Sequence, residues 1–310
     1  MPVIAADLGG TKLALAVVTA QAELLLQKEI LLNKETDAGD TVCNAIAGLL
    51  EETASLNIPV AGVGICVPGI YRRSEKTVWA PNIPGWDNYP LYNKIKAVTG
   101  RRPLYIESDR SCYIMGEQWQ GAAKGCTDAI YLAIGTGIGA GILSEGRILK
   151  GANDIAGAVG WLTAEGPVHG SSNLEAFASG EGIARTAGEL LATENTYTGV
   201  LREKSPDTLT AHDVFAAYEN NDALARKVLA QSIVLWGKAA ANLISIFNPQ
   251  KIIFGGGVFG PAIRFIPAIA DETKKWAQPV SMQQVSIEAS ALGKAAGLYG
   301  AGLLALQSLD

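Results

Sequence analysis

The chain has 310 residues, of which 48% are hydrophobic and 18% are charged, and its formal net charge is −5. This length and composition exclude a disordered polymer and allow two domains, since single cores stop growing at about 250–300 residues. The negative charge and the lack of a basic patch in the sequence argue against a nucleic-acid partner.

The elements predicted in the first third of the chain begin with strands over 3–6, 13–18 and 23–32, the first two joined by a tight Gly-rich turn. A helix over 41–54, with Asp40 as its N-cap, precedes a buried strand over 60–67. The proline-rich segment 79–86 is expected to be a loop. A strand over 103–107 then leads into a helix that begins at Ser108 or Asp109 and ends near Gln120.

The second half of the chain repeats part of this pattern. Strands over 129–134 and 140–144 flank a second Gly-rich turn and precede a short segment over 147–150, which suggests a weak internal duplication. A long helix over 223–247 ends at Asn248-Pro249, because proline cannot continue a helix. A strand over 251–254 and a small-residue helix over 291–304, suited to close packing, follow. The alternation predicts an α/β fold with mixed sheets.

The patterns of cysteine, histidine and apolar residues argue against a histidine-based metalloprotein, a secreted protein and a membrane protein. The four cysteines have no Cys-x-x-Cys spacing and are expected to be buried free thiols in a reducing compartment. Two isolated histidines are too few for a metal site built on imidazoles. The N-terminal run Met1–Asp7 is typical of a first strand rather than a secretory signal, and no stretch of about 18 apolar residues is free of charges or glycine-rich breaks. A cytoplasmic protein without a membrane span is therefore expected.

Three glycine clusters follow strands and predict a phosphate site, because glycine permits positive φ and exposes backbone N–H groups. The clusters are Gly9-Gly10-Thr11, Gly135-Thr136-Gly137 and Gly255-Gly256-Gly257. One cluster alone is more often an ordinary turn. The sequence contains no Walker A string, and a Rossmann fingerprint fails at Ala140, so the common alternative nucleotide motifs are excluded.

Charged residues accompany these turns. Asp7 beside a phosphate turn can hold Mg²⁺, commonly through water, and Lys12 can neutralise phosphate charge. Asp109 lies where a strand meets a helix, a position that projects a carboxylate into a cleft. Local sequence leaves two alternatives open: Asp7 bonding the amides of its own turn, and Asp109 acting only as an N-cap.

Short motifs spread over essentially the whole chain carry a family resemblance. They are Asp7–Lys12, Val67–Gly69, Pro81-Asn82, Gly85-Trp86, Ser108-Asp109, Gly116-Glu117, Leu132–Gly139, Lys150–Asn153, Leu174–Gly180, Asn248-Pro249, Gly255–Val258 and Ala291–Gly293. Together they resemble the ROK family of bacterial sugar kinases and repressors, within the class that also holds actin, hexokinase and the heat-shock chaperone ATPases.

The resemblance implies a two-domain actin-like ATPase (ribonuclease H-like) fold with an interdomain cleft. The implied domains are residues 1–110 plus 293–310, and residues 111–292. The implied function is transfer of the γ-phosphoryl group of ATP to a sugar hydroxyl, with Mg²⁺ as cofactor, Asp109 as general base and a homodimer as the assembly. The first two glycine clusters and Lys12 would hold phosphates, and Gly255–Gly257 would border the adenosine. The implied sugar-binding residues are Gly69, Asn82, Ser108, Asp109, Asn153, Trp161 and Glu175.

The chain also departs from the family pattern. Ser108 replaces the usual asparagine before the base, and the family's Glu-x-Gly-His reads Ala158-Val159-Gly160-Trp161. The cysteine-rich zinc motif is replaced by segment 167–173, which has no cysteine, so no structural zinc is expected. Trp161 is expected either to stack on a sugar or to fill the space left by the lost side chains. Asn153 or Asp154 is expected to restore some polarity, while Arg110 either meets an acidic group or faces solvent. Fewer polar partners imply weaker discrimination for glucose.

Two further hypotheses come from other functional classes. A transcriptional regulator of this family carries an N-terminal helix-turn-helix, for which a first strand starting at Val3 is expected to leave no room. A degenerate kinase would bind sugar or nucleotide without turnover, as the altered pocket suggests. The combination of Asp7, Asp109 and complete glycine turns favours the active kinase over the degenerate one.

Overall fold

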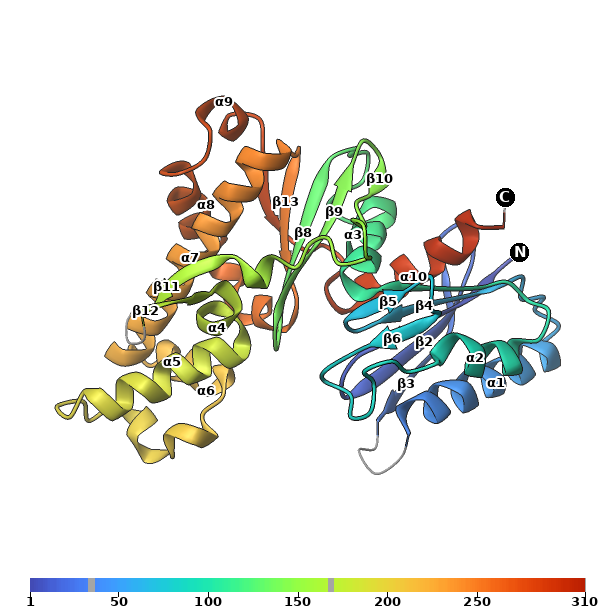
Figure 1. Ribbon diagram of the computed structural model, residues 1–310, viewed down its shortest axis with the longest axis horizontal. Coiled ribbons are helices and arrows are strands. Elements are labelled where there is room, and N and C mark those ends of the chain that lie inside the picture. The colour runs from blue at the N-terminus through green and yellow to red at the C-terminus, as the bar shows by residue number, and fades with distance from the viewer. Residues whose placement is uncertain (33–36, 167–169, 310) are drawn as a thin grey trace. The chain divides into compact units, whose positions relative to one another are not determined.

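The computed structural model describes residues 1–32, 37–166 and 170–309, which divide into two compact units. Unit 1 comprises Met1–Gly125, Ile148–Ala156 and Ala291–Asp310, and unit 2 comprises Cys126–Arg147 and Gly157–Ser290. Each unit has a five-stranded sheet with helices around it, and the predicted α/β class with mixed sheets is confirmed (Figure 1).

The sheet of unit 1 has the strand order β3-β2-β1-β4-β7. Its strands are β1 (Val3–Leu8), β2 (Lys12–Val18), β3 (Leu24–Leu31), β4 (Val63–Val67) and β7 (Leu104–Ser108). β1 pairs antiparallel with β2 and parallel with β4, which in turn pairs parallel with β7. A small hairpin of β5 (Ile70–Arg72) and β6 (Thr77–Trp79) follows β4. Three predicted site residues lie at the carboxyl ends of these strands. Asp7 is in β1, Gly69 follows β4 by two residues, and Asp109 follows β7 directly.

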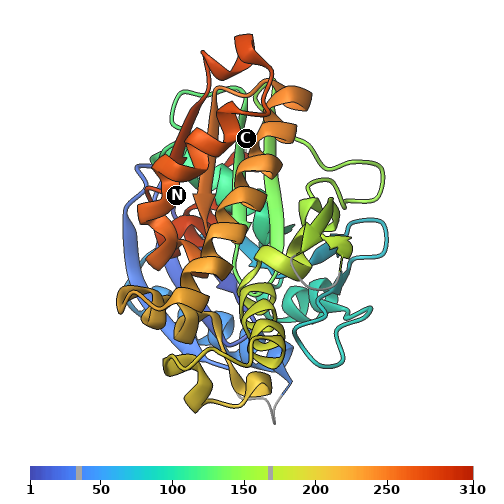
Figure 2. The same cartoon turned by 90° about the vertical axis from the view of Figure 1, so that its left-hand side faces the viewer.

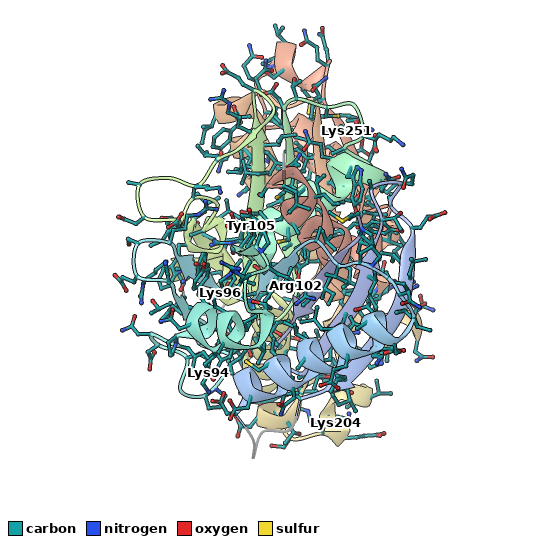
Figure 3. All side chains as sticks on the ribbon, turned by 90° about the vertical axis from the view of Figure 1, so that its right-hand side faces the viewer. Lys94, Lys96, Arg102, Tyr105, Lys204 and Lys251 are labelled. Atoms are coloured by element: carbon teal, nitrogen blue, oxygen red, sulfur yellow. The ribbon has the colours of Figure 1, made fainter. Side chains whose placement is uncertain are left out.

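Alternation along the strands of unit 1 separates two apolar layers. Ile4, Ala6 and Leu8 face α1 (Ala38–Ser55) and α2 (Leu91–Thr99), which lie side by side (Figure 3). Val3 and Ala5 belong to the opposite layer, together with residues of α3 (Asp109–Gln120) and α10 (Ala296–Gln307). This period of two is what a sheet covered on both faces requires.

The start of α1 differs from the prediction. The N-cap is Asp37, whose side chain accepts a hydrogen bond from the Gly39 N–H at 2.9 Å, and not Asp40. Lys94, labelled in Figure 3, donates to both aspartates at 2.8 Å and ties α2 to this end of α1. The Tyr89 hydroxyl also donates to Asp37, at 2.6 Å, so tertiary contacts hold this aspartate more firmly than the predicted cap Asp40.

Glycines allow α3 and α10 to pack at close range, as the small-residue pattern predicts. A Cβ on Gly116 would lie 2.3 Å from the Ala296 carbonyl oxygen, and one on Gly300 would lie 1.9 Å from that of Cys112. This packing places α3 in unit 1. The predicted boundary at residue 110 would have put α3 in the other domain, and it differs from the observed division for this reason. The predicted helix over 291–304 also begins later, at Ala296.

We expect Gly300→Ala to destabilise the protein by about 1–3 kcal/mol, because the new methyl group overlaps the backbone of α3. Gly48→Ala is the matched control, since a Cβ at Gly48 in α1 would meet no atom within 4 Å. The control should gain about 0.5–1 kcal/mol from better helix propensity. Urea unfolding of both variants tests the packing, and a Gly300→Ala protein as stable as the wild type would contradict it.

The sheet of unit 2 has the order β10-β9-β8-β13-β14, with the same sequence of antiparallel and parallel neighbours around its central strand. The strands are β8 (Ala129–Ile134), β9 (Ile138–Ser144), β10 (Arg147–Ile148), β13 (Lys251–Gly255) and β14 (Ser286–Ala289). The β1–turn–β2 and β8–turn–β9 units occupy equivalent places in the two sheets. The repeat of a strand, a glycine turn and a strand that the sequence predicts is therefore present in both sheets.

Unit 2 also contains a two-stranded hairpin and six α-helices among the described residues. They are β11 (Thr163–Gly166), β12 (Gly170–Asn173), α4 (Leu174–Ala178), α5 (Gly180–Thr193), α6 (Ala211–Glu219), α7 (Ala223–Phe247), α8 (Ile266–Lys274) and α9 (Pro279–Met282). In the described part of the chain, α7 is the one helix long and apolar enough to cross a membrane. Its Trp236 is 1% exposed and donates from Nε1 to the Ala178 carbonyl at 2.9 Å, so α7 packs into the core of this unit. Figure 2 shows α7 as the long orange helix that runs along the unit.

Candidate active site

The first glycine turn closes the β1–β2 hairpin. The Gly9 N–H donates to the Lys12 carbonyl at 2.8 Å, and Gly10 and Thr11 are exposed at the tip. Neither glycine of this turn has a positive φ, so the conformational reason for predicting glycine here does not apply. Gly10 instead lies beside Asn82, since a Cβ on it would be 3.8 Å from the Asn82 Cβ. The structure thus brings a predicted sugar residue close to a predicted phosphate turn.

Asp7 has a half-buried carboxylate on β1, immediately before this turn. Its Oδ2 is so close to α10 that a Cβ on Gly297 would lie 2.2 Å away. Burial raises the pKa of Asp7 to about 6, and the negative charge of Asp109 also raises it, while a hydrogen bond from the Cys66 thiol and the charge of Lys12 lower it. Asp7 is therefore partly protonated near neutral pH when no cation is beside it.

Lys12 extends from the start of β2 toward β3 rather than staying free. Its Nζ forms an ion pair with Glu29 Oε2 at 2.7 Å, and both side chains are more than one-third exposed. An exposed pair of this kind contributes little to stability and is easily exchanged for another anion.

Asp109 is the first residue of α3 and follows β7 directly. Its Oδ1 accepts the Arg110 N–H at 2.7 Å and lies 3.4 Å from the Ser108 hydroxyl, which also makes contact with the Arg110 Nε at 3.3 Å. Burial raises the pKa of Asp109, against the lowering effects of the Arg110 charge, the Arg110 N–H and the Ser108 hydroxyl. A carboxyl group with a raised pKa is suited to accept a proton.

Ser108 occupies the N-cap position of α3 without capping it. Its hydroxyl donates instead to the Gly69 carbonyl at 2.6 Å. Gly69 has φ +91°, and a Cβ there would lie 2.2 Å from the Trp79 carbonyl oxygen, so only glycine fits. Gly69, Ser108 and Asp109, which the resemblance links to the sugar, are therefore held together within unit 1.

A charged network next to Asp109 contains residues that the sequence reasoning missed. Glu107, which is 4% exposed, forms ion pairs with Lys150 at 3.0 Å and with Arg73. Arg73 also pairs with Asp154 at 3.4 Å. The carboxylate of Asp154 is therefore paired with Arg73 and does not simply replace the polar groups missing from the sugar pocket. The neighbouring Asn153 is exposed. A charged residue within the otherwise apolar β7 was the one signal available in the sequence.

The second glycine turn joins β8 to β9 in unit 2. The Gly135 N–H donates to the Gly137 carbonyl at 2.9 Å, the Gly135 carbonyl accepts the Gly180 N–H at 2.7 Å, and Thr136 is exposed. Glu175 on α4 accepts the Ile138 N–H at 2.6 Å, and its Oε2 would be 2.6 Å from a Cβ on Gly137. The Glu175 carboxylate thus supports this turn, a contact that the predicted sugar role did not include.

The third cluster lies beside the second. A Cβ on Gly135 would be 3.9 Å from the Gly257 nitrogen. Gly256 has φ +91° and is the one member of the three clusters with a positive φ. Gly255 is required for a steric reason, because its Cβ would fall 1.9 Å from the Tyr131 hydroxyl oxygen. Unit 2 therefore brings two of the predicted nucleotide-binding clusters together.

The residues at the altered motifs differ in their environments. Trp161 is 75% exposed, so its side chain does not fill the space left by the lost side chains, and stacking on a sugar stays a prediction.

The segment predicted to lack a zinc site overlaps residues 167–169, which lie outside the described residues. Within 1–32, 37–166 and 170–309, no three His, Cys, Asp or Glu side chains are grouped as metal ligands would be. All four cysteines are buried free thiols, as predicted.

Two sheets of identical strand order, each with a glycine turn after its central strand, are the framework of the actin-like ATPases. Residues 3–308 match the ROK family, and the chain belongs to that family. The glucokinase of Halalkalibacterium halodurans is 32% identical over 98% of this chain and 94% of its own length.

Two solved structures extend the comparison. The ROK hexokinase of Thermus thermophilus is 28% identical, with a TM-score of 0.83 over 100% of this chain and 99% of that one. A ROK glucokinase from Streptomyces griseus, in complex with glucose and AMPPNP, is also 28% identical, with a TM-score of 0.79 over 99% of this chain and 100% of that one. These relatives confirm the predicted fold and the predicted enzyme class, a carbohydrate kinase.

Proposed function

We propose that this chain transfers the γ-phosphoryl group of ATP to a sugar hydroxyl, with Asp109 as the general base. The observation that carries this assignment is the position of Asp109, at the start of α3 and hydrogen-bonded only through Oδ1 in the contacts described above. The burial that raises its pKa brings its proton affinity closer to that needed at neutral pH. Ser108 and Gly69 hold the adjoining backbone, so the carboxylate presents a fixed face to the attacking hydroxyl.

The glycine turns would bind the phosphates. In the first turn we assign this role to exposed Gly10 and Thr11, because the Gly9 N–H already closes the hairpin. Lys12 would leave Glu29 for a phosphate oxygen. In unit 2, Thr136 and Gly137 would bind phosphate oxygens and Gly255–Gly257 would border the adenosine. Positioning of this kind supplies most of the catalysis in phosphoryl transfer, where little covalent chemistry is asked of the protein.

The surroundings of Asp7 fit a magnesium ion. Its oxygen is the donor type that Mg²⁺ prefers, and a second carboxylate, Asp109, contributes negative potential. Asp7 would hold the ion through water. Bound Mg²⁺ would neutralise charge on the transferred phosphoryl group.

For the sugar we propose Gly69, Asn82, Ser108, Asn153, Trp161 and Glu175 as binding residues. Ala158 and Trp161 stand where the family resemblance places a glutamate and a histidine, so fewer groups are available to hydrogen-bond glucose hydroxyls. The preferred sugar would therefore differ from glucose or be selected loosely. We further propose a zinc-free homodimer in the cytoplasm, a compartment that keeps the four buried thiols reduced.

Coupled measurement of ADP release tests this function. We expect at least one member of a panel of hexoses, amino sugars, β-glucosides and sugar acids to raise ADP release well above the sugar-free rate. Polyphosphate in place of ATP forms a second arm, and elemental analysis of the purified protein checks for zinc. Sugar or nucleotide binding by calorimetry without turnover would instead identify a degenerate kinase.

A further inference from the structure

The buried carboxylate of Glu107 joins three segments of unit 1. Glu107 lies on β7, two residues before the proposed base, and its Oε1 accepts the Ser108 N–H at 3.0 Å. Its Oε2 pairs with Lys150 at 3.0 Å and with Arg73, which follows β5. A carboxylate this deeply buried is stable only when it is paired, so the three segments depend on one another.

Lys150 belongs to segment 148–156, whose position in the chain is unusual. The segment packs with unit 1, although the residues on both sides of it belong to unit 2. It forms a tight loop, in which the Ala156 N–H donates to the Lys150 carbonyl at 3.0 Å and Gly151 has φ +73°. Its attachment to unit 1 must therefore be specified by contacts along a short stretch of chain.

Asp154 provides a second attachment, through the same Arg73 that pairs with Glu107. Its φ of +59° is costly for a residue with a side chain and persists only when the surroundings fix it. Its carboxylate pairs with Arg73 Nε at 3.4 Å and accepts the Arg73 N–H at 3.4 Å. Arg73 thus bridges Asp154 and Glu107, and the loop is held at Lys150 and at Asp154.

Asn153 lies between these two anchors, and Ser108 and Asp109 follow Glu107 directly. We propose that Glu107 is a positioning residue, which fixes segment 148–156 through Lys150 and Arg73 so that Asn153 and the base keep one geometry toward the acceptor sugar. This inference rests on the proposed kinase function. Displacements of about 1 Å at such groups are enough to lose substrate positioning.

Glu107→Gln tests the proposal, because glutamine keeps an oxygen for the Ser108 N–H while removing the charge that pairs with Lys150 and Arg73. We expect KM for the sugar to rise about 10-fold or more, KM for ATP to change less than about 2-fold, and amide hydrogen exchange in 148–156 to accelerate. Lys150→Met should weaken sugar binding in the same way. The double variant should be little worse than either single one, since both remove the same link.

Glu272→Gln is the matched control. Glu272 on α8 is also a buried carboxylate, paired with Lys275 at 2.5 Å and with the Trp276 Nε1 at 2.8 Å, and neither partner is a proposed site residue. The Glu272→Gln variant should lose thermal stability, while its KM for the sugar should not change. This control separates positioning from a general loss of stability.

The outcomes are distinguishable from those for the proposed function. Wild-type exchange rates in 148–156 of Glu107→Gln would overturn the proposal, whether or not the enzyme turns over. Faster exchange with an unchanged sugar KM would also overturn it, since Glu107 would then be purely structural. Absence of turnover in the wild type with every sugar would reject the kinase function instead, and the exchange comparison would still decide whether Glu107 holds the segment.

Discussion

Asp109→Ala should lower kcat for sugar phosphorylation by at least about 10²-fold, because it removes the group proposed to take the proton of the attacking hydroxyl. Asp109→Asn should lower it similarly, since an amide has the shape of the carboxyl group but does not accept a proton. The raised pKa of Asp109 adds a pH dependence: wild-type kcat should fall as the pH drops through that pKa and the base becomes protonated. Steady-state kinetics between pH 5 and pH 9, with sugar at saturation, measures both effects.

Two controls accompany the Asp109 variants. Calorimetric binding of AMPPNP should be unchanged, which shows that the fold and the nucleotide site persist. Thermal melting records the change in stability that accompanies the loss of this carboxylate, because its charge suits the first turn of α3 while its raised pKa means that ionisation costs the folded state free energy. A near-normal kcat for Asp109→Asn would remove this residue from the proposed mechanism.

Asp7→Asn should show opposite effects on activity and stability. Activity should fall by about 10²-fold or more if Asp7 holds the magnesium ion. Stability should rise at pH 8 in the presence of a chelator, because ionising a buried group whose pKa rises from 3.8 to about 6 costs the native state roughly 3 kcal/mol. Asparagine avoids this cost, and melting temperatures of the two proteins measure it.

The sign of the Asp7 effect follows from the direction of the pKa shift. Below about pH 4 the carboxyl group is protonated in both the folded and the unfolded protein, so the variant and the wild type should melt together. Between about pH 4 and pH 6 the unfolded protein releases the Asp7 proton while the folded protein keeps it, so the wild type loses stability relative to the variant, and the difference stays constant above about pH 6. Asp213→Asn should behave in the opposite way, because Lys204 and the Thr210 cap lower the pKa of Asp213. An Asp7→Asn protein less stable than the wild type at pH 8 would contradict the assigned environment.

Local sequence signals were sufficient for much of the framework. The helices α3 and α7 begin and end as predicted, and the strands around both glycine turns were placed to within a few residues. In each case an apolar run ends at a glycine, proline or capping residue, so the information is contiguous in the sequence. The short helix α2 and the hairpin of β5 and β6 were not predicted, because their few apolar positions gain meaning only when packed against the sheet.

The residues of the candidate site also fall into a group that the sequence predicted and a group that it did not. Pattern and resemblance identified the glycine turns, Asp7 and Asp109 without knowledge of the fold. The support of the second turn by Glu175 was not foreseen, since it depends on the Ile138 N–H far away in the chain. The network of Glu107 with Arg73 and Lys150 was missed for the same reason, as its members come from three separate segments.

The duplicated hairpins have diverged in chemistry but not in length. β1 and β8 each have six residues, and β2 and β9 each have seven, so Asp7 corresponds to Ala133 and Lys12 to Ile138. At these positions the first hairpin carries ionisable side chains, whereas the second carries only apolar ones. Among natural variants, substitutions at Asp7 and Lys12 should therefore be limited by charge, and those at Ala133 and Ile138 by side-chain volume.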